Sequence, residues 1–302
     1  MNKELLLTCC LILAACGDGA AVKEGARASN RETPALREPL VASTQAHPAL
    51  LSAPPISTSV AVEAAPRDVR MPTDWLADLR WDGAQRVAHA KRAKGDVVKE
   101  LFAKAEVGFP AKEVLFRVFK DVNEFEVWAG DGASPLKRIA TYGICAASGV
   151  LGPKRREGDL QVPEGYYKVG YYHPMSAYYL SAQVNYPNAS DKVRGGPSPG
   201  SDILIHGRCA SIGCISMTDE RIEEIYLMGW GAFMLGQPTH IHIFPSRDIE
   251  GLLAKAEHAE HHAFWQEIRP GLTAFDASHR LPAVKIASDG RYEISPAAIA
   301  PP

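Results

Sequence analysis

Residues 205–217 of the 302-residue chain read IHGRCASIGCISM, and both the fold and the site that we predict depend on this stretch. A short β-prone run ends at His206, and Cys214 follows eight residues later, after a loop that contains glycine. Such a loop can fold back and bring the imidazole into hydrogen-bonding range of the thiol. A thiolate that attacks an amide carbonyl needs a base to take its proton. We therefore predict that Cys214 is a nucleophile and that His206 is its proton acceptor and donor.

The loop between these residues supplies two further candidate site residues. Gly213 has no Cβ atom, so the backbone beside Cys214 can present N–H groups to a substrate oxygen. This property predicts an oxyanion site that includes the backbone of Gly213. Ser211 lies three residues before the cysteine, and we predict that its hydroxyl orients the imidazole or the thiol.

Two other interpretations of the histidine and the cysteines remain open. In the first, His206 is a half-buried histidine with satisfied hydrogen bonds, and Cys214 is a small core residue. In the second, Cys209, Cys214 and His206 bind a structural zinc ion, with His240 or His242 as the fourth ligand. The sequence lacks the Cys-x-x-Cys pair that is common in zinc sites, and it therefore favours a site without metal or cofactor.

The composition is that of a folded protein, with 46% hydrophobic and 23% charged residues. The net charge of −2 gives no reason to propose a nucleic-acid partner. Of the six cysteines, Cys145, Cys209 and Cys214 lie beyond the N-terminal leader, and three cysteines cannot all be paired. A cysteine left over in an oxidising compartment is consistent with a nucleophile. The sequence leaves open whether Cys209 pairs with Cys145 or with Cys214. A disulfide to Cys214 would block catalysis.

The N-terminus predicts export. Lys3 precedes an uncharged run at residues 5–15, which is too short to span a bilayer and is typical of a secretory signal. Small residues directly before Cys16 indicate a bacterial lipoprotein signal over residues 1–16, with Cys16 lipidated. Residues 17–70 contain six prolines and no aromatic residue, which predicts a disordered tether. We expect a periplasmic protein that is lipid-anchored to a bacterial membrane, with the outer membrane as one candidate.

From residue 71 onward the sequence shows helical and then strand patterns. Apolar residues at helical spacing predict a helical N-terminal extension over residues 71–111. Residues 121–123 suit the turn of a hairpin. β-prone runs predict seven short strands, at residues 114–119, 125–127, 136–145, 166–169, 178–184, 203–205 and 239–244.

The C-terminal half contains fewer elements. Thr218 is a suitable cap for a helix with an acidic first turn, and Gly229 is its expected end. Residues 246–302 are expected to form a helical and extended tail, with at most a weak strand at residues 283–286 after Pro270. Many short strands with few helices predict a β-rich α+β fold, a sandwich or barrel with helical additions at both ends.

Several segments together resemble a known family. The pairing of His-Gly at residues 206–207 with Ser-x-Gly-Cys at residues 211–214 resembles the signature of the L,D-transpeptidase catalytic domain (the YkuD type). The short spacer between the two pieces is similar to that of the YafK-like branch of this family. The resemblance covers residues 112–245. Further matching segments lie at residues 157–167 (EGDLQVPEGYY), 178–181 (YYLS), 185–188 (NYPN) and 217–226 (MTDERIEEIY).

The resemblance implies a YkuD-like β-sandwich or barrel catalytic domain over residues 112–245. It implies that Cys214 is the nucleophile, that His206 transfers protons and that the backbone of Gly213 and Cys214 helps to form the oxyanion site. The wider family usually has an arginine at the position of Ser216, whereas a small residue is common in the YafK-like branch. We assign candidate substrate contacts to Gly207, Arg208, Ser216 and Tyr179.

The resemblance leads to three hypotheses about function. In the first, the protein is an L,D-transpeptidase: Cys214 forms a thioester with a peptidoglycan stem peptide, and an amine of a second strand resolves it. In the second, water resolves the thioester, which is implied by the YafK-like branch, where the link between peptidoglycan and attached protein is hydrolysed. In the third, the chain is a non-catalytic wall-binding lipoprotein. The expected partners are peptidoglycan stem peptides, peptidoglycan-linked protein, and a membrane contacted only through the lipid anchor.

Overall fold

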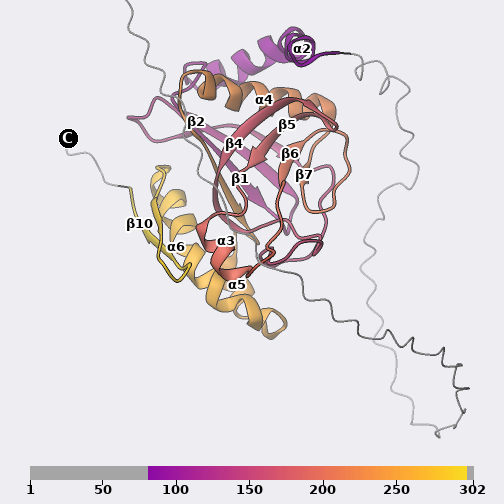
Figure 1. Ribbon diagram of the computed structural model, residues 1–302. Helices are drawn as coiled ribbons and strands as arrows, with labels where there is room; N and C mark the ends of the chain where they lie inside the picture. The colour runs from indigo at the N-terminus through magenta and orange to yellow at the C-terminus, as the bar shows by residue number, and fades with distance from the viewer. Residues whose placement is uncertain (1–80, 298–302) are drawn as a thin grey trace, which may run out of the picture. The chain divides into compact units, whose positions relative to one another are not determined.

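The computed structural model of the protein describes residues 81–297 (Figure 1). The predicted signal at residues 1–16, with Cys16, and the predicted tether at residues 17–70 lie outside the described residues. The first part of the predicted extension at residues 71–111 lies outside them as well. Within the described part, no helix is both long enough and apolar enough to cross a membrane.

The strands of the described region form one mixed eight-stranded sheet in the order β3-β2-β1-β8-β4-β5-β6-β7, and a separate pair of strands, β9 and β10. The β1–β8 and β6–β7 pairs are parallel, and the other neighbours in the large sheet are antiparallel. The sheet curls into a half-barrel (Figure 1), which confirms the predicted β-rich α+β class. The strands are β1 (Glu113–Phe119), β2 (Glu124–Gly130), β3 (Lys137–Gly143), β4 (Gly165–Ser176), β5 (Tyr179–Val184), β6 (Leu204–His206), β7 (Ile215–Ser216), β8 (Thr239–Phe244), β9 (Ala283–Ile286) and β10 (Tyr292–Ser295).

The seven strands expected before residue 245 correspond to β1–β6 and β8, with differences in extent. The expected strand at residues 166–169 is only the first part of β4, and the turn at residues 121–123 joins β1 to β2 as expected. The sequence does not predict β7, because two residues are too few to show a period. β7 forms because Ile215 and Ser216 lie in parallel register beside β6.

Two helices begin with side-chain caps that the sequence encodes. Asp82 and Gln85 form a capping box at the start of α2, each accepting a hydrogen bond from the backbone of the other. Thr218 caps α4, as expected, and accepts a hydrogen bond from the N–H of Arg221. The helices are α2 (Gly83–Lys104), α3 (Ala189–Arg194), α4 (Asp219–Met234), α5 (Ile249–Leu253), the 3-10 helix η1 (Ala256–His261) and α6 (His262–Ser278).

The predicted end of α4 at Gly229 is wrong, because the helix continues to Met234. Gly229 faces the sheet at a point of close approach. A Cβ atom at this position would collide with the hydroxyl of Tyr172 and come within 2.9 Å of the ring of Phe116. The glycine therefore allows α4 to pack closely on the sheet and does not end the helix.

The expectation that at most a weak strand follows Pro270 is also wrong, because α6 runs through this proline. The buried side chains of Trp265, Ile268 and Leu272 continue along one face of the helix from before the proline to after it. Burial of this continuous apolar face offsets the hydrogen bond that the proline removes. The expected strand near the C-terminus is confirmed as β9, which pairs with β10.

β1 is buried on both faces and lies between two layers of helix. Val114, Phe116 and Val118 belong to the core that α2 and α4 cover. Leu115 and Phe119 alternate with them and pack in the clusters on the α6 side. Alternate residues of a strand point to opposite faces, so β1 contributes to both cores. Figure 1 shows α2 and α4 on one side of the sheet and α6 on the other.

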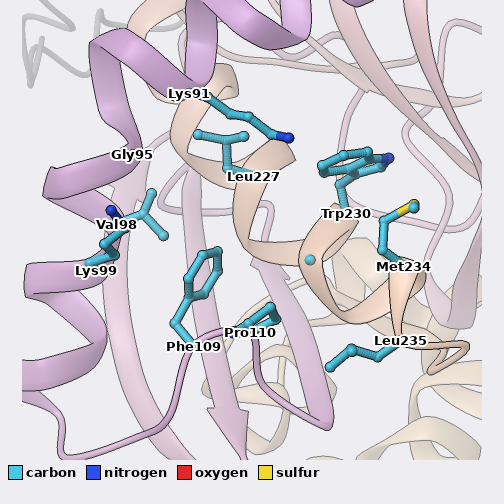
Figure 2. A pocket seen from close by; sticks show the side chains of 11 residues that line it. Lys91, Gly95, Val98, Lys99, Phe109, Pro110, Leu227, Trp230, Met234 and Leu235 are labelled. Atoms are coloured by element: carbon cyan, nitrogen blue, oxygen red, sulfur yellow. The ribbon is translucent and has the colours of Figure 1, made fainter.

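An apolar cavity of about 440 Å³ lies between α2 and α4 (Figure 2). Its walls include Phe109, Leu227 and Trp230. The ammonium group of Lys91 lies 4.6 Å from the centre of the Trp230 ring. None of the candidate catalytic residues lines this cavity. The cavity is therefore not part of the candidate active site.

Candidate active site

His206 ends β6 and is held by the strands on both sides. It pairs with Ser181 of β5 and with Ser216 of β7, and only 1% of its surface is exposed. Its Nδ1 atom lies 2.6 Å from the carbonyl oxygen of Gly207. Since a carbonyl only accepts hydrogen bonds, Nδ1 carries a proton and Nε2 is the basic nitrogen. The ring of Tyr178 packs on the imidazole, with the ring centres 4.4 Å apart.

The surroundings of His206 favour its neutral form. Burial lowers the pKa of His206, and the hydrogen bond to the Gly207 carbonyl only partly opposes this effect. The imidazole is therefore neutral at pH 7 in the resting protein, which is the form that accepts a proton from a thiol. Tyr178 is 39% exposed, so its ring separates the imidazole from solvent on that side.

The loop after β6 is fixed by a disulfide and an ion pair. The disulfide joins Cys209 to Cys145, which follows β3, and it settles the pairing that the sequence left open. Asp219, the first residue of α4, accepts a hydrogen bond from the N–H of Arg208 at 2.8 Å and pairs with its guanidinium at 3.2 Å. Both Arg208 and Cys209 have positive φ angles, 69° and 44°, so the chain turns sharply here. Cys214 is left as the free cysteine of the described region.

Cys214 directly precedes β7, and its thiol lies beside β6. The sulfur accepts a hydrogen bond from the N–H of Leu204 at 3.4 Å and lies 3.7 Å from the carbonyl oxygen of Asp202. Because a carbonyl only accepts, the resting group is a protonated thiol. Burial raises the pKa of Cys214, which also favours the thiol. Leu204 is two residues before His206, so the sheet brings the predicted pair together on adjacent strands.

No hydrogen bond joins Cys214 to His206 within residues 81–297; the thiol is directed to the Asp202 carbonyl instead. Catalytic hydrogen bonds are often absent or long before substrate binds. The absence of this bond therefore does not exclude the predicted pairing of Cys214 with His206.

Ser211 fixes the backbone of the loop and contacts neither reacting side chain. Its hydroxyl donates to the carbonyl oxygen of Cys214 at 2.7 Å and accepts from the N–H of Gly213 at 3.2 Å. The prediction that Ser211 orients the imidazole or the thiol is therefore wrong. The N–H of Gly213 is occupied by this contact, whereas the N–H of Cys214 has no partner among the described residues. Of the two predicted backbone donors, the one open to a substrate oxygen is thus that of Cys214.

Comparison with known proteins shows the family of the chain. The sequence model of the YkuD family, described as the L,D-transpeptidase catalytic domain, matches residues 117–228. The YafK protein of Escherichia coli (strain K12), whose name marks it as a provisional L,D-transpeptidase, is 34% identical over 185 residues. The matched region covers 60% of this chain and 74% of YafK. The chain belongs to the L,D-transpeptidase catalytic domain family. The resemblance that we inferred from the sequence is thereby confirmed.

Two solved structures are similar to this L,D-transpeptidase-family chain. A mutant of the helical cell shape determining protein Pgp2 from Campylobacter jejuni has a TM-score of 0.37 at 19% identity, covering 62% of this chain and 64% of that one. Bd1075 of Bdellovibrio bacteriovorus has a TM-score of 0.33 at 23% identity, covering 55% and 57%. The chain thus spans less than two thirds of either structure. These similarities assign no residue role in the L,D-transpeptidase-family site.

Three of the predicted substrate contacts in this L,D-transpeptidase-family chain are buried within the protein. Arg208 is only 8% exposed and is paired with Asp219. Gly207 lies against the same carboxylate, where a Cβ atom would be 2.5 Å from an oxygen. Ser216 is fully buried, and its hydroxyl lies 3.2 Å from Nε2 of His206. In the structure these three residues therefore contact other parts of the protein, and the predicted contacts with substrate stay a prediction.

The fourth predicted contact, Tyr179, points away from the imidazole. Its φ angle is 74°, and its hydroxyl donates to the carboxylate of Glu223 at 2.6 Å. The preceding residue, Tyr178, lies in the turn before β5 and packs on His206. The sequence did not single out Tyr178 as a neighbour of the imidazole.

The Cys145–Cys209 disulfide is incompatible with the zinc interpretation. Cys209 is bonded to Cys145, so it has no thiolate to offer a metal. His240 and His242 lie on β8, which pairs with β1 and β4 and not with the strand of His206. The region from residue 81 to residue 297 contains no group of three or more side chains that is suited to hold a metal ion.

Proposed function

We propose that this protein is a cysteine acyltransferase that modifies peptidoglycan, and that its reaction is L,D-transpeptidation of stem peptides. Its membership of the L,D-transpeptidase catalytic domain family supports this proposal. The observation that carries it is the free thiol of Cys214, which lies against the backbone of β6, the strand that ends in the neutral imidazole of His206, after a loop that a disulfide fixes. A nucleophile, a base and an open backbone donor are the parts that acyl transfer requires.

Acylation begins in this proposal when the Cys214 thiol turns from the Asp202 carbonyl toward Nε2 of His206. His206 takes the thiol proton, and the sulfur attacks the carbonyl carbon of the stem-peptide amide. The N–H of Cys214 donates to the oxyanion that forms. His206 then gives the proton to the leaving amine, the C–N bond breaks, and an acyl thioester remains on Cys214.

Deacylation uses the same two residues in reverse order. An amine of a second stem peptide attacks the thioester carbonyl, and His206 takes a proton from the attacking nitrogen. The new amide bond forms as the C–S bond breaks, and the sulfur recovers its proton from His206. The product is a cross-link between two stem peptides.

Exposed apolar side chains near the thiol favour a second candidate function, hydrolysis of the link between peptidoglycan and an attached protein. Val150 is 69% exposed, Leu160 49% and Ile212 77%. Their loops adjoin: the N–H of Val150 donates to Gln161, and a Cβ atom at Gly213 would be 3.9 Å from the backbone of Leu160. Exposed apolar groups beside a nucleophile suit an apolar polypeptide segment better than a short, polar stem peptide. In this case water resolves the thioester.

Mass spectrometry of muropeptides incubated with the protein distinguishes the two candidates. We expect new cross-linked dimers, because an amine acceptor resolves the thioester in transpeptidation. Shortened stems or released protein would instead support hydrolysis. A parallel incubation with the Cys214→Ala variant controls for products that form without the thiol. Identical products from both proteins would contradict the acyltransferase proposal.

We also propose that the protein is exported to the periplasm and anchored by a lipid on Cys16, which lies outside the described residues. The leader composition supports this proposal. We expect the protein in membrane fractions, with a lipid-modified Cys16 as its first residue by mass spectrometry. Cys16→Ser should leave an unmodified and uncleaved leader. Soluble wild-type protein that retains Met1 would contradict the proposal.

A further inference from the structure

Three side chains form a row across β5, β6 and β7. Ser181 pairs with His206, and His206 pairs with Ser216. Residues that are paired across strands place their side chains on the same face of a sheet, so the two serines flank the imidazole. All three residues are buried. The hydroxyl of Ser216 lies 3.2 Å from Nε2 of His206, whereas the buried hydroxyl of Ser181 has no hydrogen-bond partner among the described residues.

The protons in this row can be assigned from their acceptors. The Nδ1 proton of His206 is directed to the carbonyl oxygen of Gly207 at 2.6 Å. The hydroxyl of Ser216 donates to the carbonyl oxygen of Ala210 at 2.5 Å. A serine hydroxyl has one proton, so the Ser216 oxygen presents only lone pairs to Nε2. A hydrogen bond between these two atoms therefore forms only when Nε2 is protonated, that is, in the imidazolium.

We propose that Ser216 is a positioning residue that stabilises the imidazolium form of His206 during acyl transfer. The proposal rests on the proposed function, in which His206 takes the Cys214 proton. In that step the S–H bond breaks, an N–H bond forms at Nε2, and the electron pair stays on sulfur. The Ser216 oxygen accepts a hydrogen bond from the new N–H. The proton later passes to the nitrogen of the leaving amine, and Nε2 becomes basic again.

The other groups that face His206 give the imidazolium little support. The ring of Tyr178 covers one side of it, and Cys214 lies on the loop beside it. At the start of α4, the carboxylate of Asp219 is paired with the Arg208 guanidinium, which carries the opposite charge. Burial lowers the pKa of His206 and so disfavours the imidazolium. An acceptor at Nε2 acts in the opposite direction.

The test is the pKa of His206, measured in the full chain by NMR titration of its imidazole with no substrate present. Without the Ser216 acceptor, the imidazolium loses a hydrogen bond to a charged group, which corresponds to about one pH unit or more. We expect Ser216→Ala to lower the pKa of His206 by about one unit.

Ser181→Ala is the matched control, because it removes a buried hydroxyl from the other side of His206 that makes no hydrogen bond. We expect its pH profile to match that of the wild type. Ser216→Thr keeps the hydroxyl and should keep the wild-type profile. Ser216→Val, in which the side chain is isosteric with that of threonine but has no hydroxyl, should shift it. This second pair gives the same comparison if the alanine variant does not fold.

An unchanged profile in Ser216→Ala, an equal shift in Ser181→Ala, or equal profiles in Ser216→Thr and Ser216→Val would overturn the proposal. The titration of His206 needs no peptidoglycan substrate. A shift confined to the variants without the Ser216 hydroxyl would therefore support the role of Ser216 even if the muropeptide experiment failed. The pH profile and the product analysis thus test the two proposals separately.

Discussion

Replacement of Cys214 by alanine is expected to abolish acyl transfer and to leave the fold intact. The thiol supplies the atom that forms the thioester, and no other free cysteine occurs within residues 81–297. Loss of the nucleophile should lower turnover of peptidoglycan fragments by about 10⁴-fold or more. Among the described residues the thiol forms hydrogen bonds with the backbone of Leu204 and Asp202 and with no other side chain, so the free energy of unfolding should change by about 1 kcal/mol.

The measurement combines muropeptide turnover with thermal unfolding of the same samples. Cys214→Ser is a closer control, because it keeps a side chain of similar shape but offers a hydroxyl that His206 ionises far less readily. Both variants should unfold near the wild-type temperature, and neither should form a thioester that mass spectrometry detects. Wild-type turnover in either variant would show that Cys214 is not the nucleophile.

Removal of the Cys145–Cys209 disulfide is expected to destabilise the protein and to weaken catalysis. The two cysteines are 64 residues apart, and a cross-link over such a loop contributes about 4 kcal/mol to the free energy of unfolding. The backbone N–H groups of Cys145 and Cys209 also donate to the carbonyls of Ser216 and Met217. The disulfide thus holds the strand after Cys214 from both sides, and its loss loosens the alignment of the nucleophile with the base.

The double variant Cys145→Ser/Cys209→Ser isolates this effect because it leaves Cys214 as it is. Urea unfolding should show a lower midpoint, and muropeptide turnover should fall in the folded protein. Dithiothreitol should lower the stability of the wild type to that of the double variant but should not affect the double variant itself. A double variant as stable as the wild type would show that the disulfide contributes nothing.

The sequence allows the placement of His206 and Cys214 at neighbouring strands to be predicted, because this placement depends on local spacing. His206 ends a β-prone run and Cys214 follows after a glycine-containing loop. In the structure His206 is the last residue of β6 and Cys214 directly precedes β7. The roles of the surrounding residues depend on register, which local patterns do not contain. Ser216, for example, faces inward because β7 pairs with β6.

Helix boundaries were mispredicted where tertiary packing outweighs local propensity. A glycine such as Gly229 commonly marks the end of a helix. In the structure it lies in the middle of α4, where close contact with Tyr172 leaves no room for a side chain. A proline such as Pro270 commonly interrupts a helix, but the buried face of α6 continues across it. The two-residue strand β7 has too few residues to show any pattern. In each case the deciding contact comes from a distant part of the chain.

The parallel pairing of β1 with β8 has a consequence for the order in which the domain folds. The register places Val114 beside Thr239, so the middle of the sheet joins segments that are far apart in the chain. The β1–β2 hairpin forms from neighbouring residues and can assemble early. The other edge of β1 stays open until β8 has been synthesised and has docked. A chain that ends before β8 therefore exposes a long apolar strand edge, and we expect such fragments to aggregate.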